Sequence, residues 1–452
     1  MKIERFGKLR VLTLLSAAVL AACGGGSDDP PARGSVVSAQ QAVVLTTTQI
    51  GAAAAAVQLD TLAGAPLCDV AVRSVVYQTR DPSGAAATAS TAVMVPQGSN
   101  AACSGNRPVV LYAHGTAVDK NKNMADVVND GEAALLLAMY AAQGMVVVAP
   151  NYLGYGSSSL SYHPYLNAEA QAVDMIDGLR AAKADLQAQA GTKLLPNKVL
   201  ISGYSQGGHV AMATQRALER DHAAEFTVLA AGPMSGPYNL LKFNDAVVGP
   251  GPINAGATLF VPMLMTSYQK SYGNIYSQTS DVFQSAYAPT IEGLLPSTKS
   301  VAALIGEGKL PADPTFTALF GTGGLLTDSF RSTYATSNYR KAVQTNTLLG
   351  WTPKAGTVLC GGSLDPTVFF FNSTDASEDF LNRNAVVPAW DLETRSTMPA
   401  GTAFDAVVAG FAAAKTAAGA NATAKYHGEL VPPFCTALVR GYFQQVLAAS
   451  TP

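Results

Sequence analysis

The chain has 452 residues, with 29 Lys and Arg against 31 Asp and Glu, which gives a formal net charge of −2 at pH 7. This balance argues against a nucleic-acid-binding protein, which normally carries a basic surplus concentrated in a patch. Hydrophobic residues make up 48% of the chain and charged residues 13%. The chain is therefore apolar enough to bury a large core, and its length predicts one large domain with an insertion, or two domains.

The first 23 residues are typical of a bacterial export signal. Several basic side chains precede an apolar run, Val11–Leu20, which is too short to span a bilayer. The sequence Leu20-Ala21-Ala22-Cys23 follows and resembles the lipobox of bacterial lipoproteins. This resemblance implies removal of residues 1–22 and acylation of the Cys23 thiol. A plain signal peptide cleaved nearby is the alternative.

A segment poor in core-forming residues begins with three glycines after Cys23 and continues through Pro30-Pro31. We expect residues 23–45 to be a flexible tether. Gly24, rather than an aspartate, after the cysteine favours sorting to the outer membrane or surface of a bacterium. Because no later apolar run demands a spanning helix, we expect membrane contact only through the N-terminal lipid anchor.

Four cysteines follow Cys23, and we expect them to form two disulfides because an exported chain meets an oxidising compartment. Four cysteines allow three pairings. We favour Cys68–Cys103 and Cys360–Cys435, since each pair flanks one structural unit in the sequence. No CxxC or CxxH spacing occurs, so a metal site is the weaker interpretation.

Short apolar runs alternate with helical patterns from Val70 onward. The expected strands span residues 70–79, 90–95, 108–113, 144–149, 198–202, 227–231 and 357–360, and the expected helices span residues 131–142, 168–190 and 206–220. Continuous apolar runs such as PVVLYA at 108–113 are typical of strands buried on both faces of a parallel sheet. The alternation predicts an α/β fold with a doubly wound, mostly parallel sheet.

The alternation stops between residues 237 and 354, where turn residues, aromatic residues and weak helical patterns replace buried strands. This block is too long for a loop. We expect a mostly helical cap, or lid, inserted between a first core segment, 46–236, and a second, 355–452. A weakly patterned continuation of the core is the alternative.

A serine nucleophile is indicated by Gly203-Tyr204-Ser205-Gln206-Gly207, a G-x-S-x-G motif. The motif stands where the apolar run 198–202 ends and a helical pattern begins, which is the turn that such a serine requires. Glycines relieve the clashes of this strained turn, and the helix N-terminus favours negative charge developing near the hydroxyl. In this context the motif resembles the nucleophile turn of the α/β-hydrolase superfamily. A tight turn with a bystander serine is the alternative.

The superfamily order of catalytic residues is serine, acid, histidine. Of the five histidines, only His427 lies in the last quarter of the chain; the others are His114 at a strand end, His163 in a loop, His209 on the helix after the serine, and His222 at a helix end. We therefore expect His427 to be the general base.

The acid is expected just after the strand 357–360, where Asp365 lies in a loop that resembles the superfamily's G-x-x-D-x-x-V turn. It would hold the imidazole tautomer and stabilise the imidazolium. Asp375, Asp379 and Asp391 are rivals that lie further from a strand end. An ordinary surface-turn aspartate is the alternative for Asp365.

The oxyanion hole is expected from backbone N–H groups of two loops. The residue after the nucleophile, Gln206, would supply one donor. By resemblance to hydrolases with an HG-x motif, the loop His114-Gly115-Thr116 would supply the other, from Thr116 or from Gly115. His114 would then shape the loop, and a plain strand-end turn is the alternative.

Further segments resemble bacterial relatives of the secretory lipases of the lipase A type. They are residues 77–81, 92–96, 150–156, 162–166 and 203–209, and the resemblance covers about residues 65–447. Asn151 departs from the pattern, since many relatives have aspartate there; it lies outside the triad. The position of the insertion matches the lid of that family.

The resemblance implies hydrolysis of carboxylic esters with apolar acyl chains through an acyl-enzyme, on a small-molecule or lipid substrate. Five aromatic residues of the cap are candidate walls of the acyl pocket: Tyr268, Tyr272, Tyr276, Phe283 and Tyr287. The alternative is that they only form the hydrophobic core of the cap. No cofactor is expected, because Ser-His-Asp chemistry needs none. A serine peptidase, an acyltransferase and a non-catalytic surface lipoprotein remain alternatives.

Overall fold

The computed structural model describes residues 30–189, 194–249 and 254–450. The expected signal sequence and Cys23 lie outside these ranges. All the elements below belong to the unit that begins at Ala32. None of the helices in the described ranges is long and apolar enough to cross a membrane.

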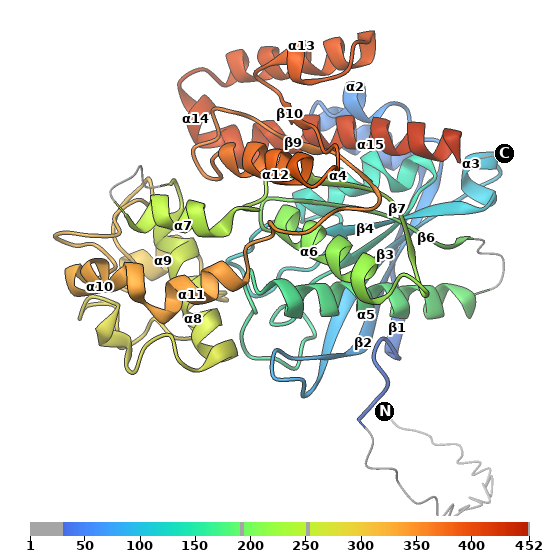
Figure 1. The fold of residues 1–452 in the computed structure, drawn as a ribbon. Coiled ribbons are helices and arrows are strands. Elements are labelled where there is room, and N and C mark those ends of the chain that lie inside the picture. The colour runs from blue at the N-terminus through green and yellow to red at the C-terminus, as the bar shows by residue number, and fades with distance from the viewer. Residues whose placement is uncertain (1–29, 190–193, 250–253, 451–452) are drawn as a thin grey trace, which may run out of the picture. The chain divides into compact units, whose positions relative to one another are not determined.

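A ten-stranded sheet runs through the described residues in the order β1-β2-β3-β5-β4-β6-β7-β9-β10, and β8 pairs with β7 (Figure 1). The strands span Val36–Leu45 (β1), Asp69–Arg80 (β2), Ala86–Gln97 (β3), Arg107–Ala113 (β4), Val146–Pro150 (β5), Leu194–Tyr204 (β6), Thr227–Met234 (β7), Gly356–Thr357 (β8), Leu359–Gly361 (β9) and Ala389–Asp391 (β10). The pairs β1–β2, β2–β3 and β3–β5 are antiparallel, and the remaining strand pairs are parallel. The expected doubly wound, mostly parallel sheet is confirmed.

Helices cover both faces of this sheet (Figure 1). They span Thr47–Ala56 (α1), Asp60–Ala63 (α2), Ala101–Ser104 (α3), Gly131–Met139 (α4), Ala168–Gln187 (α5), Gln206–Asp221 (α6), Phe371–Asn382 (α12), Thr402–Ala418 (α13), Ala422–Lys425 (α14) and Val431–Ala449 (α15). In the view of Figure 1, α5 and α6 lie below the sheet, and α4, α13 and α15 lie above it. Each face has its own buried apolar cluster.

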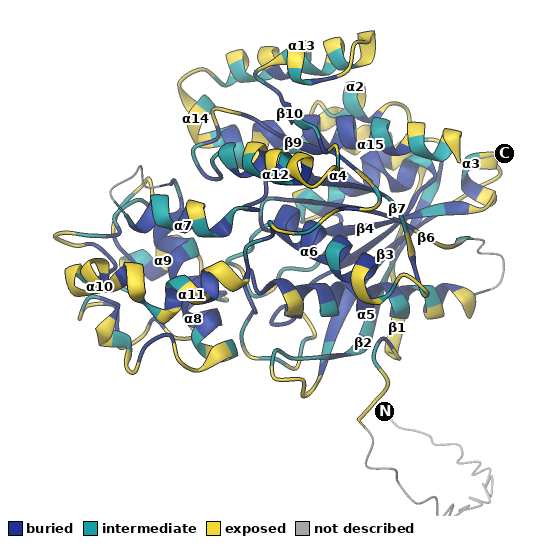
Figure 2. Cartoon of the chain, viewed as in Figure 1, coloured by how far each residue is buried: buried dark blue, intermediate teal, exposed yellow. Residues whose placement is uncertain are grey.

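Burial explains why the central strands read as continuous apolar runs. All residues of β5 are buried, as are Val109–Ala113 of β4. Figure 2 shows buried residues along the strands and on the inner faces of the helices, and exposed residues on the outer face of α13. The strand ends are therefore held rigidly between two packed layers, which suits a site built on them.

The parallel register brings the carboxyl ends of four strands to one edge of the sheet. Ala113 of β4 pairs with Gly203 of β6, the adjacent Tyr204 pairs with Met234 of β7, and Met234 pairs with Cys360 of β9. The loops that follow these strands consequently begin side by side. They contain the expected nucleophile, the expected acid and the loop of the expected oxyanion hole.

The cap, defined as residues 237–354, lies between β7 and β8 and contributes no strand to the sheet in its described part. Its helices are Leu240–Val248 (α7), Ala257–Tyr272 (α8), Val301–Gly306 (α9), Asp328–Thr333 (α10) and Asn338–Thr345 (α11), at the left of Figure 1. The cap contains most of a third buried apolar cluster. An insertion with helices and no sheet strand in its described part lies where the sequence analysis places the cap, although helices span fewer than half of its described residues.

The expected tether is too long at its C-terminal end. Val36–Leu45 forms β1, an edge strand that pairs in antiparallel fashion with β2. Most of its residues are exposed, so the strand lacks the alternation of buried and exposed positions by which a strand is recognised. The sequence pattern therefore does not distinguish this edge strand from the tether that precedes it.

Both expected disulfides are present. Cys68–Cys103 joins the segment before β2 to α3, and Cys360–Cys435 joins β9 to α15. The second bond therefore links the strand that precedes Asp365 to the helix that follows His427.

Candidate active site

Ser205 occupies a sharp turn between β6 and α6. Its backbone has φ 59° and ψ −120°, in the left-handed half of the map that a non-glycine residue rarely adopts. A Cβ atom at Gly203 would lie 2.2 Å from the carbonyl oxygen of Gly207, and one at Gly207 would lie 1.9 Å from that of Ala113. Glycine is thus required on both sides of the serine because the turn packs directly against neighbouring backbone.

The three expected triad residues lie in one hydrogen-bonded chain. The Ser205 Oγ lies 2.8 Å from His427 Nε2, and His427 Nδ1 lies 2.6 Å from Asp365 Oδ2. His427 belongs to the helical turn Tyr426–Leu430, just before α15. This is the geometry in which an imidazole can accept the serine proton while a carboxylate holds the opposite ring nitrogen.

The carboxylate of Asp365 is fixed by its own loop. Its side chain is 1% exposed. The backbone N–H groups of Thr367 and Val368 donate to its Oδ1 at 2.8 and 3.0 Å. Because Oδ1 is held in this way, Oδ2 points to the imidazole.

Tyr204, the residue before Ser205, supports His427, which the sequence analysis did not predict. Its hydroxyl donates to the backbone carbonyl of His427 at 2.5 Å. Burial, and next the charge of Asp365, raise the pKa of Tyr204 well above its usual value, so the hydroxyl remains a donor. The tyrosine occupies the first variable position of the G-x-S-x-G motif, so no pattern marked it.

Comparisons with known proteins identify the family of this fold. Residues 110–450 match the model of the alpha/beta hydrolase family. The chain belongs to the α/β-hydrolase family. The rice cell wall degrading esterase LipA from Xanthomonas oryzae is similar in structure, with a TM-score of 0.77 and 30% sequence identity over 93% of this chain and 100% of LipA.

Two more distant structures share the fold. One is a putative hydrolase from Legionella pneumophila, with a TM-score of 0.72 and 22% identity over 92% of this chain and 99% of that chain. The other is Candida antarctica lipase A, with a TM-score of 0.55 and 13% identity over 79% and 76% of the two chains. A search of curated protein sequences gave no match.

In this α/β-hydrolase the loop expected to form the oxyanion hole differs from the expectation at one residue. The Gly115 N–H donates to both carboxylate oxygens of Glu132, at 3.0 and 3.2 Å, so it is not available to a substrate. No hydrogen bond from the backbone N–H of Thr116 occurs within the described ranges. Thr116 and Gln206 therefore remain the two candidate donors, and Gly115 is excluded.

Three of the other histidines are buried side chains that hold backbone in place. His114 contacts the carbonyl oxygen of Asn151 through Nε2 at 3.1 Å, and His209 contacts that of Asn346 through Nε2 at 2.8 Å. His163 contacts the carbonyl oxygen of Leu153 through Nδ1 at 2.8 Å. None of them reaches Ser205.

The remaining histidine and the rival acids have other partners. His222 lies beside Arg180 and Glu225, Asp375 pairs with Lys242, and Asp379 pairs with Arg383. Asp391 accepts hydrogen bonds from the backbone N–H groups of Ser363 and Glu393, at 2.9 and 3.0 Å. Asp391 thus supports the loop of Asp365 and does not replace it.

Two cavities meet at Ser205. The first is enclosed mainly by the cap and is lined by Thr116, Tyr165, Leu166, Ser205, Gln206, Pro237, Leu240, Phe243, Asn244, Val247, Asn254, Phe260, Val261, Leu264 and Val368. The second is lined by Val57, Leu59, Gly115, Thr116, Gly131, Glu132, Ala134, Leu135, Tyr204, Ser205, Phe260, His427, Gly428, Glu429, Pro432 and Pro433. We call them the cap cavity and the histidine cavity.

The five aromatic residues proposed as pocket walls line neither cavity. Four of them, Tyr268, Tyr276, Phe283 and Tyr287, belong to the buried core of the cap. Tyr272 is 38% exposed, and its hydroxyl accepts from the side-chain amide of Asn346. The aromatic walls are instead Tyr165, Phe243 and Phe260 in the cap cavity.

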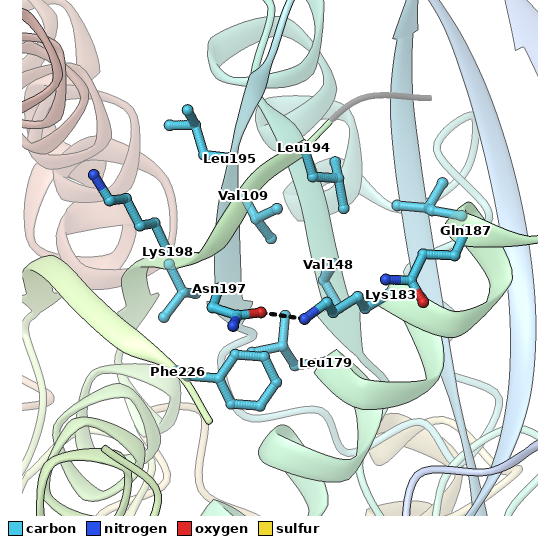
Figure 3. Close-up of a pocket in the computed structure, with 12 residues that line it drawn as sticks. Val109, Val148, Leu179, Lys183, Gln187, Leu194, Leu195, Asn197, Lys198 and Phe226 are labelled. Atoms are coloured by element: carbon cyan, nitrogen blue, oxygen red, sulfur yellow. Dashed lines mark hydrogen bonds between the residues drawn. The ribbon is translucent and has the colours of Figure 1, made fainter. Parts of the chain in front are cut away.

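A further cavity of about 300 Å³ lies away from this site (Figure 3). It is lined by side chains such as Leu194 and Lys198, at the beginning of β6, and Phe226. Ser205 follows the opposite end of β6, so this cavity is not part of the candidate active site. No cluster of His, Cys, Asp or Glu side chains in the described ranges could hold a metal ion.

Proposed function

We propose that the protein is a serine carboxylic ester hydrolase, an esterase or lipase, with Ser205, His427 and Asp365 as its catalytic triad. The observation that carries the proposal is the pair of contacts on the two nitrogens of His427, at 2.8 Å to Ser205 Oγ and 2.6 Å to Asp365 Oδ2. The likeness to the LipA esterase over almost the whole chain supports ester rather than amide hydrolysis. The apolar cavity beside the serine fits an acyl group.

The first half of the reaction forms an acyl-enzyme. Ser205 Oγ attacks the ester carbonyl carbon while His427 Nε2 takes the hydroxyl proton. The carbonyl oxygen becomes an oxyanion, which the N–H groups of Thr116 and Gln206 stabilise. His427 then gives its proton to the alcohol oxygen, the carbon–oxygen bond breaks, and the alcohol leaves.

The second half releases the acid by the same path. His427 Nε2 takes a proton from water, and the resulting hydroxide equivalent attacks the acyl carbon. When the tetrahedral intermediate collapses, His427 returns the proton to Ser205 Oγ. Asp365 stabilises the imidazolium in both halves because its buried carboxylate stays aimed at Nδ1.

The decisive experiment compares wild type with Ser205→Ala on a p-nitrophenyl ester series and on a panel of peptidyl p-nitroanilides. We expect Ser205→Ala to lower ester turnover by about 10⁵–10⁶-fold and to keep the wild-type melting temperature. The matched control is Ser202→Ala, which removes a buried serine hydroxyl from β6, the strand that precedes Ser205. Ester cleavage that persists in Ser205→Ala, or serine-dependent cleavage of anilides alone, would contradict the proposal.

We also propose that the protein is exported and anchored by a lipid on Cys23. The proposal rests on the sequence of the N-terminal segment. Mass spectrometry of the mature chain should find its N-terminus at Cys23 with a mass increase for the diacylglyceride, and Cys23→Ser should shift the protein to the aqueous phase of a detergent partition. A mature chain that begins elsewhere would contradict the anchor and leave the esterase proposal intact.

A further inference from the structure

Ser205 stands at the boundary of two cavities of very different size. The cap cavity and the histidine cavity share Thr116, Ser205 and Phe260 in their walls. The volume open to the centres of water molecules is about 40 Å³ in the cap cavity and about 580 Å³ in the histidine cavity. An ester bound at Ser205 must place one of its two halves in each.

The direction of proton transfer decides which half of the ester lies in which cavity. The leaving alcohol oxygen must receive its proton from His427 Nε2, so the alcohol has to lie on the side of the serine that faces the imidazole. His427 lines the histidine cavity and not the cap cavity. The alcohol therefore occupies the histidine cavity, and the acyl chain occupies the cap cavity beside Gln206.

The volume of each cavity then limits the size of the half of the ester that it holds. The volume open to the centres of water molecules is more than tenfold smaller in the cap cavity than in the histidine cavity, so the acyl group is the more restricted half. Its inner wall consists of buried side chains that include Phe243, Val247 and Leu264. A long acyl chain would have to displace them, which is costly in a close-packed interior.

The histidine cavity has a wide and mixed surface. Val57, Leu59, Leu135, Pro432 and Pro433 give it apolar walls, and Glu132 and Glu429 are charged residues of its lining. Val57 is 63% exposed, so the cavity opens to solvent on this side. Such a cavity accommodates an alcohol that is large and carries both apolar and hydrogen-bonding groups.

From this asymmetry we infer that the substrate is an ester of a short-chain acid and a bulky alcohol. The inference rests on the proposed ester hydrolysis and narrows it. The acyl side is specified tightly by the cap, and the alcohol side is specified loosely.

The first test measures kcat/KM on two substrate series. In the acyl series, from p-nitrophenyl acetate to palmitate, we expect the maximum at acetyl to butyryl and a fall of at least about tenfold by octanoyl. In the alcohol series, from methyl acetate to naphthyl acetate, we expect no fall with alcohol size. A maximum at octanoyl or longer overturns the inference alone, whereas wild type that cleaves no ester overturns the proposed function as well.

The second test enlarges the cap cavity, which is inferred to hold the acyl chain. Leu264→Ala and the milder Val247→Ala should each move the maximum of the acyl series to a longer chain. The matched control is Leu319→Ala, which removes a buried leucine of the cap core that lines neither cavity and should leave the acyl profile unchanged. An unchanged profile in a folded Leu264→Ala or Val247→Ala enzyme overturns the acyl assignment.

The third test narrows the histidine cavity, which is inferred to hold the alcohol. Ala134 is a partly buried wall residue of the histidine cavity. Ala134→Trp should lower kcat/KM for naphthyl acetate by about tenfold or more while methyl acetate keeps its value within about threefold. Equal losses on both esters overturn the alcohol assignment.

Discussion

The hydroxyl oxygens of Tyr165 and Thr116 lie 2.9 Å apart. Two residues earlier in the same loop, His163 Nε2 lies 2.6 Å from the side-chain nitrogen of Gln206. The segment 162–166 thus holds the side chains of both residues whose backbone N–H groups are proposed to stabilise the oxyanion. Since neither side chain is proposed to take part in the chemistry, this segment positions the two donors.

Removing the Tyr165 hydroxyl should weaken transition-state stabilisation more than substrate binding. We expect Tyr165→Phe to lower kcat by about tenfold, the equivalent of one hydrogen bond, with KM nearly unchanged. Thr116→Val should have a similar effect, and the double variant should be no worse than either single one because the two hydroxyls share one interaction.

The affinity for a boronic-acid transition-state analogue should fall in parallel with kcat. Tyr334→Phe is the control, because it removes a hydroxyl that donates to Asp245 in the cap, away from both cavities. A loss in melting temperature without a loss of analogue affinity would show that Tyr165 is only structural.

Asp365→Asn should lower kcat by about 10⁴-fold, since the amide favours the wrong imidazole tautomer. KM and the circular-dichroism melting curve should stay close to wild type. Asp375→Asn, which alters an aspartate paired with Lys242, should keep its activity within a few-fold. A fully active Asp365→Asn enzyme would refute this role for Asp365.

The two disulfides should differ in their effect on activity. Replacing either pair with alanine should lower the free energy of unfolding by about 3–5 kcal/mol. Only loss of Cys360–Cys435 should also lower kcat, because this bond joins the strand before Asp365 to the helix after His427. Activity is compared at a temperature below both melting transitions, and equal kcat values for the two double variants would contradict the link.

Acid should destabilise the protein through its buried histidines. Burial lowers the pKa of His114 and His163 to about 3 and that of His209 to about 4, from 6.5. Below pH 6.5 the unfolded chain therefore binds protons that the folded chain does not, and each histidine removes up to about 1.4 kcal/mol of stability per pH unit. Asp174, whose pKa burial raises to about 7, acts in the opposite direction.

The contribution of His209 to the pH dependence of stability is obtained by comparing a variant that lacks this histidine with wild type. His209→Gln keeps a donor for the carbonyl of Asn346 and removes the titration, so its unfolding free energy should fall less steeply than that of wild type between pH 6.5 and about 4. Parallel pH curves for His209→Gln and wild type would contradict this account.

Local sequence was enough to predict the main elements of the site. Ser205 was marked by two glycines at a strand-to-helix junction, where only glycine fits against the neighbouring backbone. His427 followed from chain order, and Asp365 followed from its place after an apolar strand. The signals for Ser205 and Asp365 are local because buried parallel strands, tight turns and helix starts each depend on residues close together in the chain, whereas His427 is identified by its order along the chain.

What depends on distant residues was decided by the tertiary structure. The Gly115 N–H is taken by Glu132 on α4, and Tyr204 donates to the backbone of His427, 223 positions along the chain. β1 is a strand because β2 offers it an edge, although its own residues are mostly exposed. The sizes of the cap cavity and the histidine cavity depend on side chains from several elements that meet only in the fold. Local motifs therefore predict the triad, whereas the availability of each candidate oxyanion donor and the sizes of the two cavities depend on packing, which no local pattern encodes.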